Sequence, residues 1–397
     1  MYERYREALA SVPLPAALVD LDAVDANVDA LIQPVRASNK TLRVASKSIR
    51  CVELLRHITA RGGGAIHGIM AYAASEAVHL VDHGFHDVLV AYPVARELEA
   101  TLIAEANRRA KVSVVVDAQT HLDVLDEAAQ KAEVQIPVVV EADVAFRPFG
   151  GSVHLGAHRS PLRSPQAVVD LARRAAAKRH LVVHGVMAYE SQIAGLQDAN
   201  PFEPLLNAPK RWLKRLSRPD VARTRADIAR GLSDADIPIE MFNGGGTGSL
   251  RSSCEEQVLT EVAAGSGFLG SLLFDYFEGL SIRPAAMFAL TITRVPEAGL
   301  VTCHGGGYVA SGSASPDKLP RPFLPEGLSL LDMEGAGEVQ TPVKVPAGVR
   351  LGIGDPVFFR HAKAGELAKN FREYHLVRGQ QVVDTVPTYR GEGCCFL

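Results

Sequence analysis

The chain has 397 residues, of which 47% are hydrophobic and 22% charged, a balance typical of globular proteins rather than disordered or fibrous ones. The formal net charge is -3, from 42 basic and 45 acidic residues, so the chain lacks the basic excess that binds nucleic-acid backbones. No run of about 18 apolar residues occurs, and the first residues carry charges where a signal peptide is apolar. We therefore expect a cytoplasmic protein of two structural units, without nucleic-acid or membrane partners.

The five cysteines are odd in number and scattered, which argues against a disulfide framework. Their positions are Cys51, Cys254, Cys303, Cys394 and Cys395. The last two are adjacent, but no residues with the spacing of zinc ligands surround them in the sequence. We therefore expect reduced thiols and no cysteine-based metal site.

Short apolar runs of strand length alternate with amphipathic stretches of helical period between residues 14 and 280. The first runs are AALVDLD, before a helical pattern over residues 23–38, and LRVASK, before VELLRHITARG. Further runs are AIHGIM, DVLVAYP, VSVVVDA, IPVVVEADV, LVVHGVMAYE and IEMFNGGG. This alternation predicts parallel strands covered by helices. About eight such strands close into a barrel, so we predict an α/β fold with a (β/α)8 barrel over residues 14–280.

The sequence changes character after residue 280. Short strand-like runs are separated by turns that contain Gly, Pro, Asn and Asp. These runs are ALTITRV, LVTCHGGGYVASG, VRLGIGDPVFFR, EYHLVRG and QVVDTVPTYRG. The pattern predicts a mostly antiparallel β domain over residues 281–397, and residues 1–13 are an open candidate for packing on it.

Lys47 ends LRVASK, the first clear barrel strand, and the reacting groups of such barrels lie at the carboxyl ends of their strands. A lysine at the mouth of an apolar barrel loses solvation, which lowers the pKa of its amine and favours imine formation with a carbonyl cofactor. The alternative is a surface lysine whose charged end reaches into solvent. We take Lys47 as the first candidate reactive residue.

Two glycine-rich segments follow late strands. The first is NGGGTGS, from Asn243 to Ser249, and the second is AGSG at residues 264–267. Glycine N–H groups can approach phosphate oxygens closely, and a hydroxyl such as that of Thr247 adds a further donor. The first segment lacks the GK[ST] ending of a nucleotide P-loop, so we expect the phosphate of another kind of ligand. Two flexible turns without a ligand are the alternative.

Seven segments occur in the order seen in one enzyme family: LVDLDAVDANV, RVASKSIR, VVVEADV, HGVMAYESQ, NGGGTGS, LTEVAAGSGF and GDPVFFRHAKAGEL. Together they resemble the fold-type III pyridoxal phosphate enzymes, the alanine racemase-like barrels, over nearly the whole chain. The closest resemblance is to the D-threonine aldolase and D-serine dehydratase branch. It implies pyridoxal 5′-phosphate as cofactor, a small amino acid as substrate, and a head-to-tail homodimer.

By this resemblance Lys47 forms the Schiff base with the cofactor. Tyr189 would lie beside the cofactor, in MAYES where the family tends to show YEGH, and Gln192 replaces the histidine expected there. Arg147 and Arg159 compete for the role of the cofactor-facing arginine, and GAHRS keeps the expected Gly-x-x-Arg spacing, which favours Arg159. The residues expected to hold the phosphate are Gly245, Gly246, Thr247, Gly265 and Ser266.

The main departure from this branch is the segment His361-Ala362-Lys363. The branch has a histidine there and, two residues later, an aspartate or cysteine that completes a divalent metal site. Residues i and i+2 of a strand face the same way, so we expect His361 and Lys363 to point into the site together. An ammonium does not ligate a metal, and we expect a metal-free site in which Lys363 supplies positive charge. The alternatives are an exposed edge strand, or a metal on His361 with help from Glu366 and Glu338.

The resemblance, together with the departure at residues 361–363, implies a lyase that cleaves the Cα–Cβ bond of a D-threonine-like β-hydroxy-D-amino acid, giving an aldehyde and a smaller amino acid. The cofactor weakens whichever α-carbon bond lies perpendicular to its ring. His361 is the candidate base for the β-hydroxyl proton, because the neighbouring Lys363 would keep it unprotonated.

Three alternatives stay open. A D-serine-type dehydratase would remove the α-proton through Lys47 and expel the β-hydroxyl, a step usually helped by a metal. A racemase needs a second base on the other face of the cofactor, for which Tyr308 is the candidate. A non-catalytic pyridoxal phosphate carrier of the single-barrel kind would lack the more than 100 residues that follow residue 280 here.

Overall fold

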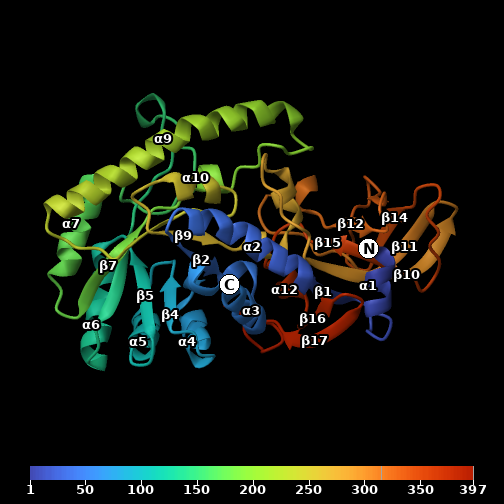
Figure 1. Ribbon diagram of the computed structural model, residues 1–397, viewed down its shortest axis with the longest axis horizontal. Helices are drawn as coiled ribbons and strands as arrows, with labels where there is room; N and C mark the ends of the chain where they lie inside the picture. The colour runs from blue at the N-terminus through green and yellow to red at the C-terminus, as the bar shows by residue number, and fades with distance from the viewer. Residues whose placement is uncertain (314, 397) are drawn as a thin grey trace.

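The computed structural model describes residues 1–313 and 315–396, and it shows a barrel and a sheet domain lying side by side (Figure 1). The barrel is closed and consists of eight parallel strands in the order β2-β3-β4-β5-β6-β7-β8-β9. Their bounds are β2 Thr41–Ala45, β3 Ile66–Ala71, β4 Asp87–Val90, β5 Lys111–Val116, β6 Ile136–Glu141, β7 Leu181–Met187, β8 Met241–Gly244 and β9 Glu261–Ala264. The predicted eight-stranded barrel is thereby confirmed.

Helices join successive strands on the outside of the barrel (Figure 1). They are α3 Val52–Gly62, α4 Ala74–Asp82, α5 Glu97–Ala106, α6 Gln119–Ala132, α7 Pro165–Ala176, α8 Ser191–Ala194, α9 Pro204–Asp234 and α10 Leu250–Glu255. The strands are buried on both faces, which explains why they read as continuous apolar runs. Side chains from the strands, with Ala91 just after β4, form an apolar cluster inside the barrel: Met70, Leu89, Ala91, Val115, Val139, Met187, Met241 and Ala263.

The sheet domain has nine strands in the order β13-β14-β11-β10-β1-β16-β17, with β15 pairing to β10 and β12 pairing to β15. Their bounds are β1 Ala16–Asp20, β10 Ala286–Glu297, β11 Leu300–His304, β12 Arg321–Leu324, β13 Ser329–Leu330, β14 Gln340–Lys344, β15 Pro356–Arg360, β16 Glu373–Arg378 and β17 Gln381–Pro387. All pairs are antiparallel except β1 with β16. The predicted, mostly antiparallel β domain is confirmed.

β1 corrects the predicted barrel range of 14–280. It lies in the sheet domain, where Ala16 pairs with Ala289 of β10 and Leu18 with His375 of β16. All five residues of β1 are buried, so the run has the same apolar character as a barrel strand. Only its partners, which come from the far end of the chain, distinguish the two locations. The barrel begins at β2.

Asp20 ends β1 and starts α2 (Leu21–Ala37), because its carboxylate accepts hydrogen bonds from the backbone N–H groups of Asp22 and Ala23. The helix α2 lies between the barrel and the sheet domain (Figure 1). At the N-terminus, α1 (Tyr2–Ala8) packs on the sheet, where the buried ring of Tyr5 joins an apolar cluster with Phe358. The N-terminal residues thus belong to the sheet domain, and the barrel strands follow them in the sequence.

Two short helices, α11 (Ser266–Leu269) and α12 (Glu366–Asn370), follow β9 and β15. Within residues 1–313 and 315–396 no helix combines the length and apolar character needed to cross a bilayer. The same residues form no disulfide, and three of the cysteines, Cys51, Cys254 and Cys303, are buried.

Candidate active site

Loops at the carboxyl ends of the barrel strands line a cavity of about 250 Å³. All but one of the predicted site residues line it. They are Lys47, Arg159, Tyr189, Gly245, Gly246, Thr247, Gly265, Ser266 and Lys363. The exception is His361. Lys47 and Lys363 are 316 positions apart in the sequence, yet both line this cavity. The cavity lies at the carboxyl ends of the strands, where the reacting groups of β/α barrels are found.

Lys47 lies in a short 3-10 turn, Ser46–Ser48, directly after β2. Its side chain is exposed to the cavity, and its Nζ lies 4.3 Å from the ring centroid of Tyr72. Protein atoms surround the cavity, and the resulting desolvation, together with the charges of Arg159 and Lys363, lowers the pKa of the Lys47 amine to about 8. A lysine amine with this pKa is a ready nucleophile for a carbonyl group.

Glu76 of α4 fixes the turn that carries Lys47. Its carboxylate accepts hydrogen bonds from the Ser46 hydroxyl at 2.6 Å and from the Tyr72 backbone N–H at 2.8 Å. Burial raises the pKa of Glu76, with opposition from these two donors. Sequence reasoning missed Glu76, although a carboxylate just after a barrel strand is a recognisable signal.

The two glycine segments form one surface, because the Thr247 hydroxyl joins them. Its Oγ1 accepts from the backbone N–H of Gly267 at 3.1 Å and of Gly265 at 3.4 Å. The backbone N–H groups of Thr247 and Ser266 have no acceptor among the described residues, so they remain available to a ligand. A Cβ on Gly265 would lie 2.8 Å from the Ser48 hydroxyl and 3.0 Å from the Ala45 carbonyl oxygen, so a larger residue does not fit there.

A buried carboxylate, Glu190, holds the first glycine segment in place. Its Oε2 accepts from the Gly245 N–H at 3.0 Å, and its Oε1 accepts from the hydroxyls of Ser249 at 2.7 Å and Ser253 at 2.6 Å. Arg225 pairs with the same carboxylate. Burial alone would raise the pKa of Glu190, but Arg225 and the hydroxyl donors outweigh it and the net shift is downward. Sequence reasoning did not identify this network, which depends on residues far apart in the chain.

Arg159 faces the cavity, whereas Arg147 does not line it. The Nη2 of Arg159 lies 2.8 Å from Glu141 Oε1 and donates to the Ala91 carbonyl at 3.2 Å. Burial raises the pKa of Glu141 to about 7, and Arg159 opposes this shift. Arg147 instead pairs with Asp143. The Gly-x-x-Arg spacing thus pointed to the arginine that reaches the cavity.

Tyr189 lies beside Arg159, whose Cζ is 5.9 Å from the tyrosine ring centroid. Burial raises the pKa of the Tyr189 phenol to about 12, so it remains a neutral hydrogen-bond donor near neutral pH. Gln192, at the position where the family resemblance predicts histidine, donates to the Val144 carbonyl at 2.8 Å and the Ser217 hydroxyl at 3.0 Å. It does not line the cavity and acts as a packing residue behind it.

The expectation that His361 and Lys363 point into the site together is wrong for His361. β15 ends at Arg360, so the alternation of side chains along a strand does not continue to residues 361–363. Lys363 lines the cavity, and its Nζ lies 3.2 Å from the Ser311 hydroxyl. His361 is 2% exposed, and burial together with Arg360 lowers the pKa of its imidazole to about 3. It is therefore neutral and held away from the cavity surface.

The residues around His361 fit a metal poorly. Both ring nitrogens lack a hydrogen-bond partner among the described residues. However, among the described residues no group of three His, Cys, Asp or Glu ligand atoms includes His361. Glu366, the other ligand considered, accepts a hydrogen bond from the Ser311 N–H at 3.2 Å.

The cavity fits pyridoxal 5′-phosphate. Lys47 offers an amine for the aldehyde, and Thr247 and Ser266 offer backbone and hydroxyl donors for the phosphate. Arg159 and Lys363 add positive charge, and none of the described residues that line the cavity is an aspartate or glutamate. The cavity therefore offers positive charge and a nucleophilic amine, which suit an anionic cofactor with a reactive carbonyl.

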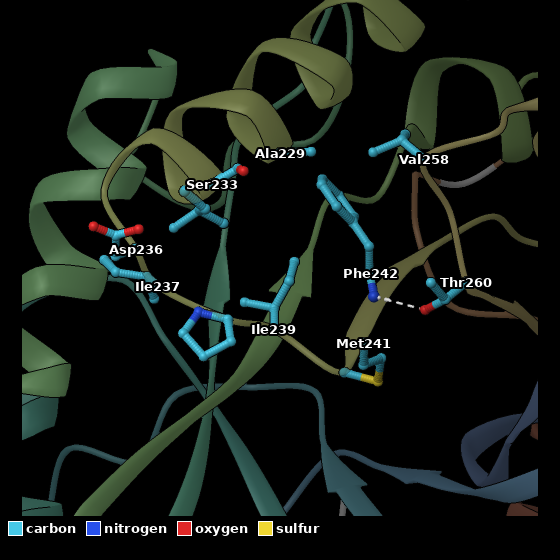
Figure 2. Close-up of a pocket in the computed structure, with 11 residues that line it drawn as sticks. Ala229, Ser233, Asp236, Ile237, Ile239, Met241, Phe242, Val258 and Thr260 are labelled. Atoms are coloured by element: carbon cyan, nitrogen blue, oxygen red, sulfur yellow. Dashed lines mark hydrogen bonds between the residues drawn. The ribbon is translucent and has the colours of Figure 1, made fainter.

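A second, larger cavity of about 510 Å³ lies at the opposite end of the barrel, before β8 and β9 (Figure 2). Its walls are mostly apolar, and Ile237, Ile239 and Phe242 lie around it, while the Phe242 N–H donates to the Thr260 hydroxyl at 2.9 Å (Figure 2). Asp236 is its one ionisable lining residue. Cavity size alone therefore does not locate the chemistry of this barrel.

Relatives of known activity match about two thirds of the chain. One is a D-threonine aldolase from Arthrobacter sp, 28% identical over 264 residues, which are 66% of this chain and 62% of the relative. Another is a 3-hydroxy-D-aspartate aldolase from Paracoccus denitrificans (strain Pd 1222), 26% identical over 257 residues, 64% of this chain and 60% of that protein. The matched part is thus about three fifths of the length of each relative.

The fold agrees with a solved structure over almost its whole length. The crystal structure of D-threonine aldolase from Filomicrobium marinum has a TM-score of 0.83 and covers 98% of this chain and 97% of its own, at 21% identity. The sequence model of a protein family, the alanine racemase N-terminal domain, matches residues 19–271 of this chain. This range includes Lys47, Arg159, Tyr189 and both glycine segments. The chain belongs to the alanine racemase N-terminal domain family, a membership that implies pyridoxal 5′-phosphate as its cofactor.

Proposed function

We propose that this protein is a pyridoxal phosphate-dependent lyase that cleaves the Cα–Cβ bond of a β-hydroxy-D-amino acid. The observation that carries the proposal is the amine of Lys47, which has a pKa of about 8 and faces the glycine surface across a cavity without acidic residues. The aldolase reaction, rather than another reaction of the family, is supported by the two aldolase relatives.

When bound, the cofactor would accept the electrons released at the α-carbon of the substrate. Lys47, Thr247 and Ser266 would hold it, with Arg159 and Tyr189 beside it. Lys47 Nζ exchanges a proton readily near neutral pH, because its pKa of about 8 lies close to that range. The Tyr189 phenol keeps its proton near neutral pH, so it would be available to orient the cofactor by donating a hydrogen bond.

Lys363 would bind a carboxylate of the substrate, since its ammonium lines the cavity and no acidic residue there competes for it. Leu273, Phe274 and Phe277 add an apolar part to the cavity lining. His361, proposed from the sequence as the base for the β-hydroxyl proton, is neutral but lies outside the cavity lining. We therefore assign Lys363 to substrate binding and leave His361 with a supporting role behind the site.

The experiment compares products from D- and L-threonine, 3-hydroxy-D-aspartate, D-serine and D-alanine, with and without EDTA. Glycine together with the matching aldehyde from the D-isomers supports the proposal. Oxo acid and ammonia would instead identify the dehydratase, and interconversion of D- and L-alanine the racemase. No product from any substrate by the cofactor-loaded protein would leave only a cofactor carrier.

The racemase alternative has less support from the contacts of Tyr308. Its ring packs against Phe288 at 5.0 Å and Phe371 at 5.1 Å between centroids, and it does not line the cavity.

We also propose the homodimer implied by the resemblance. Sedimentation at micromolar concentration tests it, and a monomer would refute it.

A further inference from the structure

Two histidines and one glutamate from opposite ends of the chain meet on the outside of the barrel. His79 lies in the last turn of α4, His83 follows the end of that helix, and Glu392 belongs to the C-terminal segment. One side-chain ligand atom from each lies within 4.8 Å of the other two. None of the three lines the cavity that holds Lys47. Of the described residues, no others form such a group of three metal-ligating side chains.

The distances suit a small tetrahedral ion. The His79 Nε2 lies 3.1 Å from Glu392 Oε2, and the His83 Nε2 lies 3.9 Å from Glu392 Oε1. A tetrahedral zinc with bonds of 2.0–2.1 Å places its ligand atoms about 3.3 Å apart. Small rotations of three partly exposed side chains would bring the observed separations to that value.

The tautomer of His83 is already set for a metal. Its Nδ1 lies 2.7 Å from the backbone carbonyl of His79, which only accepts, so Nδ1 carries the proton. The lone pair is then on Nε2, the atom that faces Glu392. Metal-binding histidines commonly donate their other ring N–H to a carbonyl in this way, which fixes the orientation of the ring.

Glu392 is carried by a turn that is fixed independently of the histidines. The Thr388 hydroxyl, fully buried, donates to the Phe371 carbonyl at 2.6 Å, and the Glu392 N–H donates to the Thr388 carbonyl at 3.0 Å. The Tyr389 N–H donates to the Arg50 carbonyl at 2.9 Å. These contacts fix the backbone of Glu392 beside α4 without using its carboxylate, which is directed toward the two histidines.

We propose that His79, His83 and Glu392 bind a zinc-type divalent cation that ties the C-terminal segment to α4. Two imidazole nitrogens and one carboxylate oxygen match the ligand preference of Zn²⁺, and water completes the fourth position. Histidines four residues apart on a helical turn are a known arrangement for such an ion. The helix α4 also carries Glu76, whose carboxylate fixes the turn with Lys47, so the ion would stabilise the helix that supports this turn.

The test uses the full chain, loaded with its cofactor and without a histidine tag, stripped with a chelator and titrated with Zn²⁺ by calorimetry. We expect one ion per chain, a saturating Zn²⁺-dependent rise in Tm of about 2–4 °C, and affinity at least about 100-fold weaker in His83→Ala and Glu392→Gln. Co²⁺ provides a second readout, since its visible absorption reports coordination and should be lost in both variants.

Two control variants locate the ion. His158 stacks on His154 with ring centroids 3.9 Å apart and has the same four-residue separation, but belongs to no group of three ligands. His158→Ala should retain the ion, and so should His361→Ala, which removes the alternative ligand near the cavity. Retention by His83→Ala and Glu392→Gln, loss in His361→Ala, or no binding by the unmodified chain would overturn the proposal. Equal Tm values of the metal-free proteins would show that the variants fold.

Discussion

At the carboxyl end of the barrel strands, Lys47, Arg159 and Lys363 surround a cavity of about 250 Å³ without an acidic lining residue. At the amino end, a cavity of about 510 Å³ is lined mostly by apolar side chains, and none of the described residues that line it is a lysine, arginine or histidine. The two ends share the same strands, which supply a packed core between them. The difference arises from the loops, since those at the carboxyl end carry the polar groups while those at the amino end close the core.

The largest effect is expected from Lys47→Ala. Loss of the amine proposed to form the imine should reduce kcat/KM by about 10³-fold or more, because both the covalent link and proton exchange are removed. Steady-state product formation and the visible absorption of the bound cofactor measure it. Near-normal activity, or an unchanged imine absorption, would overturn the assignment of Lys47.

Ile237→Ala at the amino end is the matched control for that comparison. Ile237 is 7% exposed and lines the larger cavity, so its truncation should lower the free energy of unfolding by about 2–3 kcal/mol. The kcat per folded molecule should be unchanged. A large loss of kcat in a folded Ile237→Ala protein would mean that the amino end contributes to catalysis.

Arg159→Met should reduce kcat/KM by about 10²-fold, because it removes a cation that faces the cofactor position. Arg147→Met is the control, since Arg147 pairs with Asp143 outside the cavity. It should change kcat/KM less than about threefold. The opposite ranking would show that the arginine roles are reversed.

Lys363→Met should raise KM for the amino acid about tenfold and leave kcat within about threefold, as expected when a charge contributes equally to ground-state and transition-state binding. The effect should be larger for 3-hydroxy-D-aspartate than for D-threonine if Lys363 binds a side-chain carboxylate. A selective fall in kcat would assign Lys363 to proton transfer instead.

His361 should make the protein acid-sensitive. Its pKa is about 3 when folded and near 6.5 when unfolded, so between these values the unfolded chain binds more protons and stability falls as the pH falls. His361→Leu should remove a slope of up to about 1.4 kcal/mol per pH unit between pH 6 and 4, measured by urea unfolding.

The same variant also tests the role in proton transfer. Because His361 does not line the cavity, kcat of His361→Leu should fall less than about tenfold. A loss of about 10³-fold would restore the base assignment made from the sequence. For the pH dependence of stability, His67→Gln is the control, since the side chain of His67 is 60% exposed.

Much of the candidate site could be predicted because its residues lie near strand ends and occur in motifs that resemble those of one enzyme family. Lys47 lies in the turn after β2, Thr247 follows β8 and Ser266 follows β9, so recognising the strands also located their loops. Residues that act through distant contacts were missed. Glu190 was passed over beside Tyr189, since only the fold brings Arg225, Ser249 and Ser253 to its carboxylate.

The sequence by itself determined the barrel and the sheet domain that follows it, and it located the candidate lysine and the two glycine segments at strand ends. Each depends on local periodicity or on a motif at a strand end, which neighbouring residues are sufficient to reveal. Only the tertiary structure decided that β1 joins the sheet domain, that His361 turns away from the cavity, and that Glu392 meets His79 from 313 residues away. Strand pairing, burial and ligand clusters depend on long-range packing, which a local pattern does not encode.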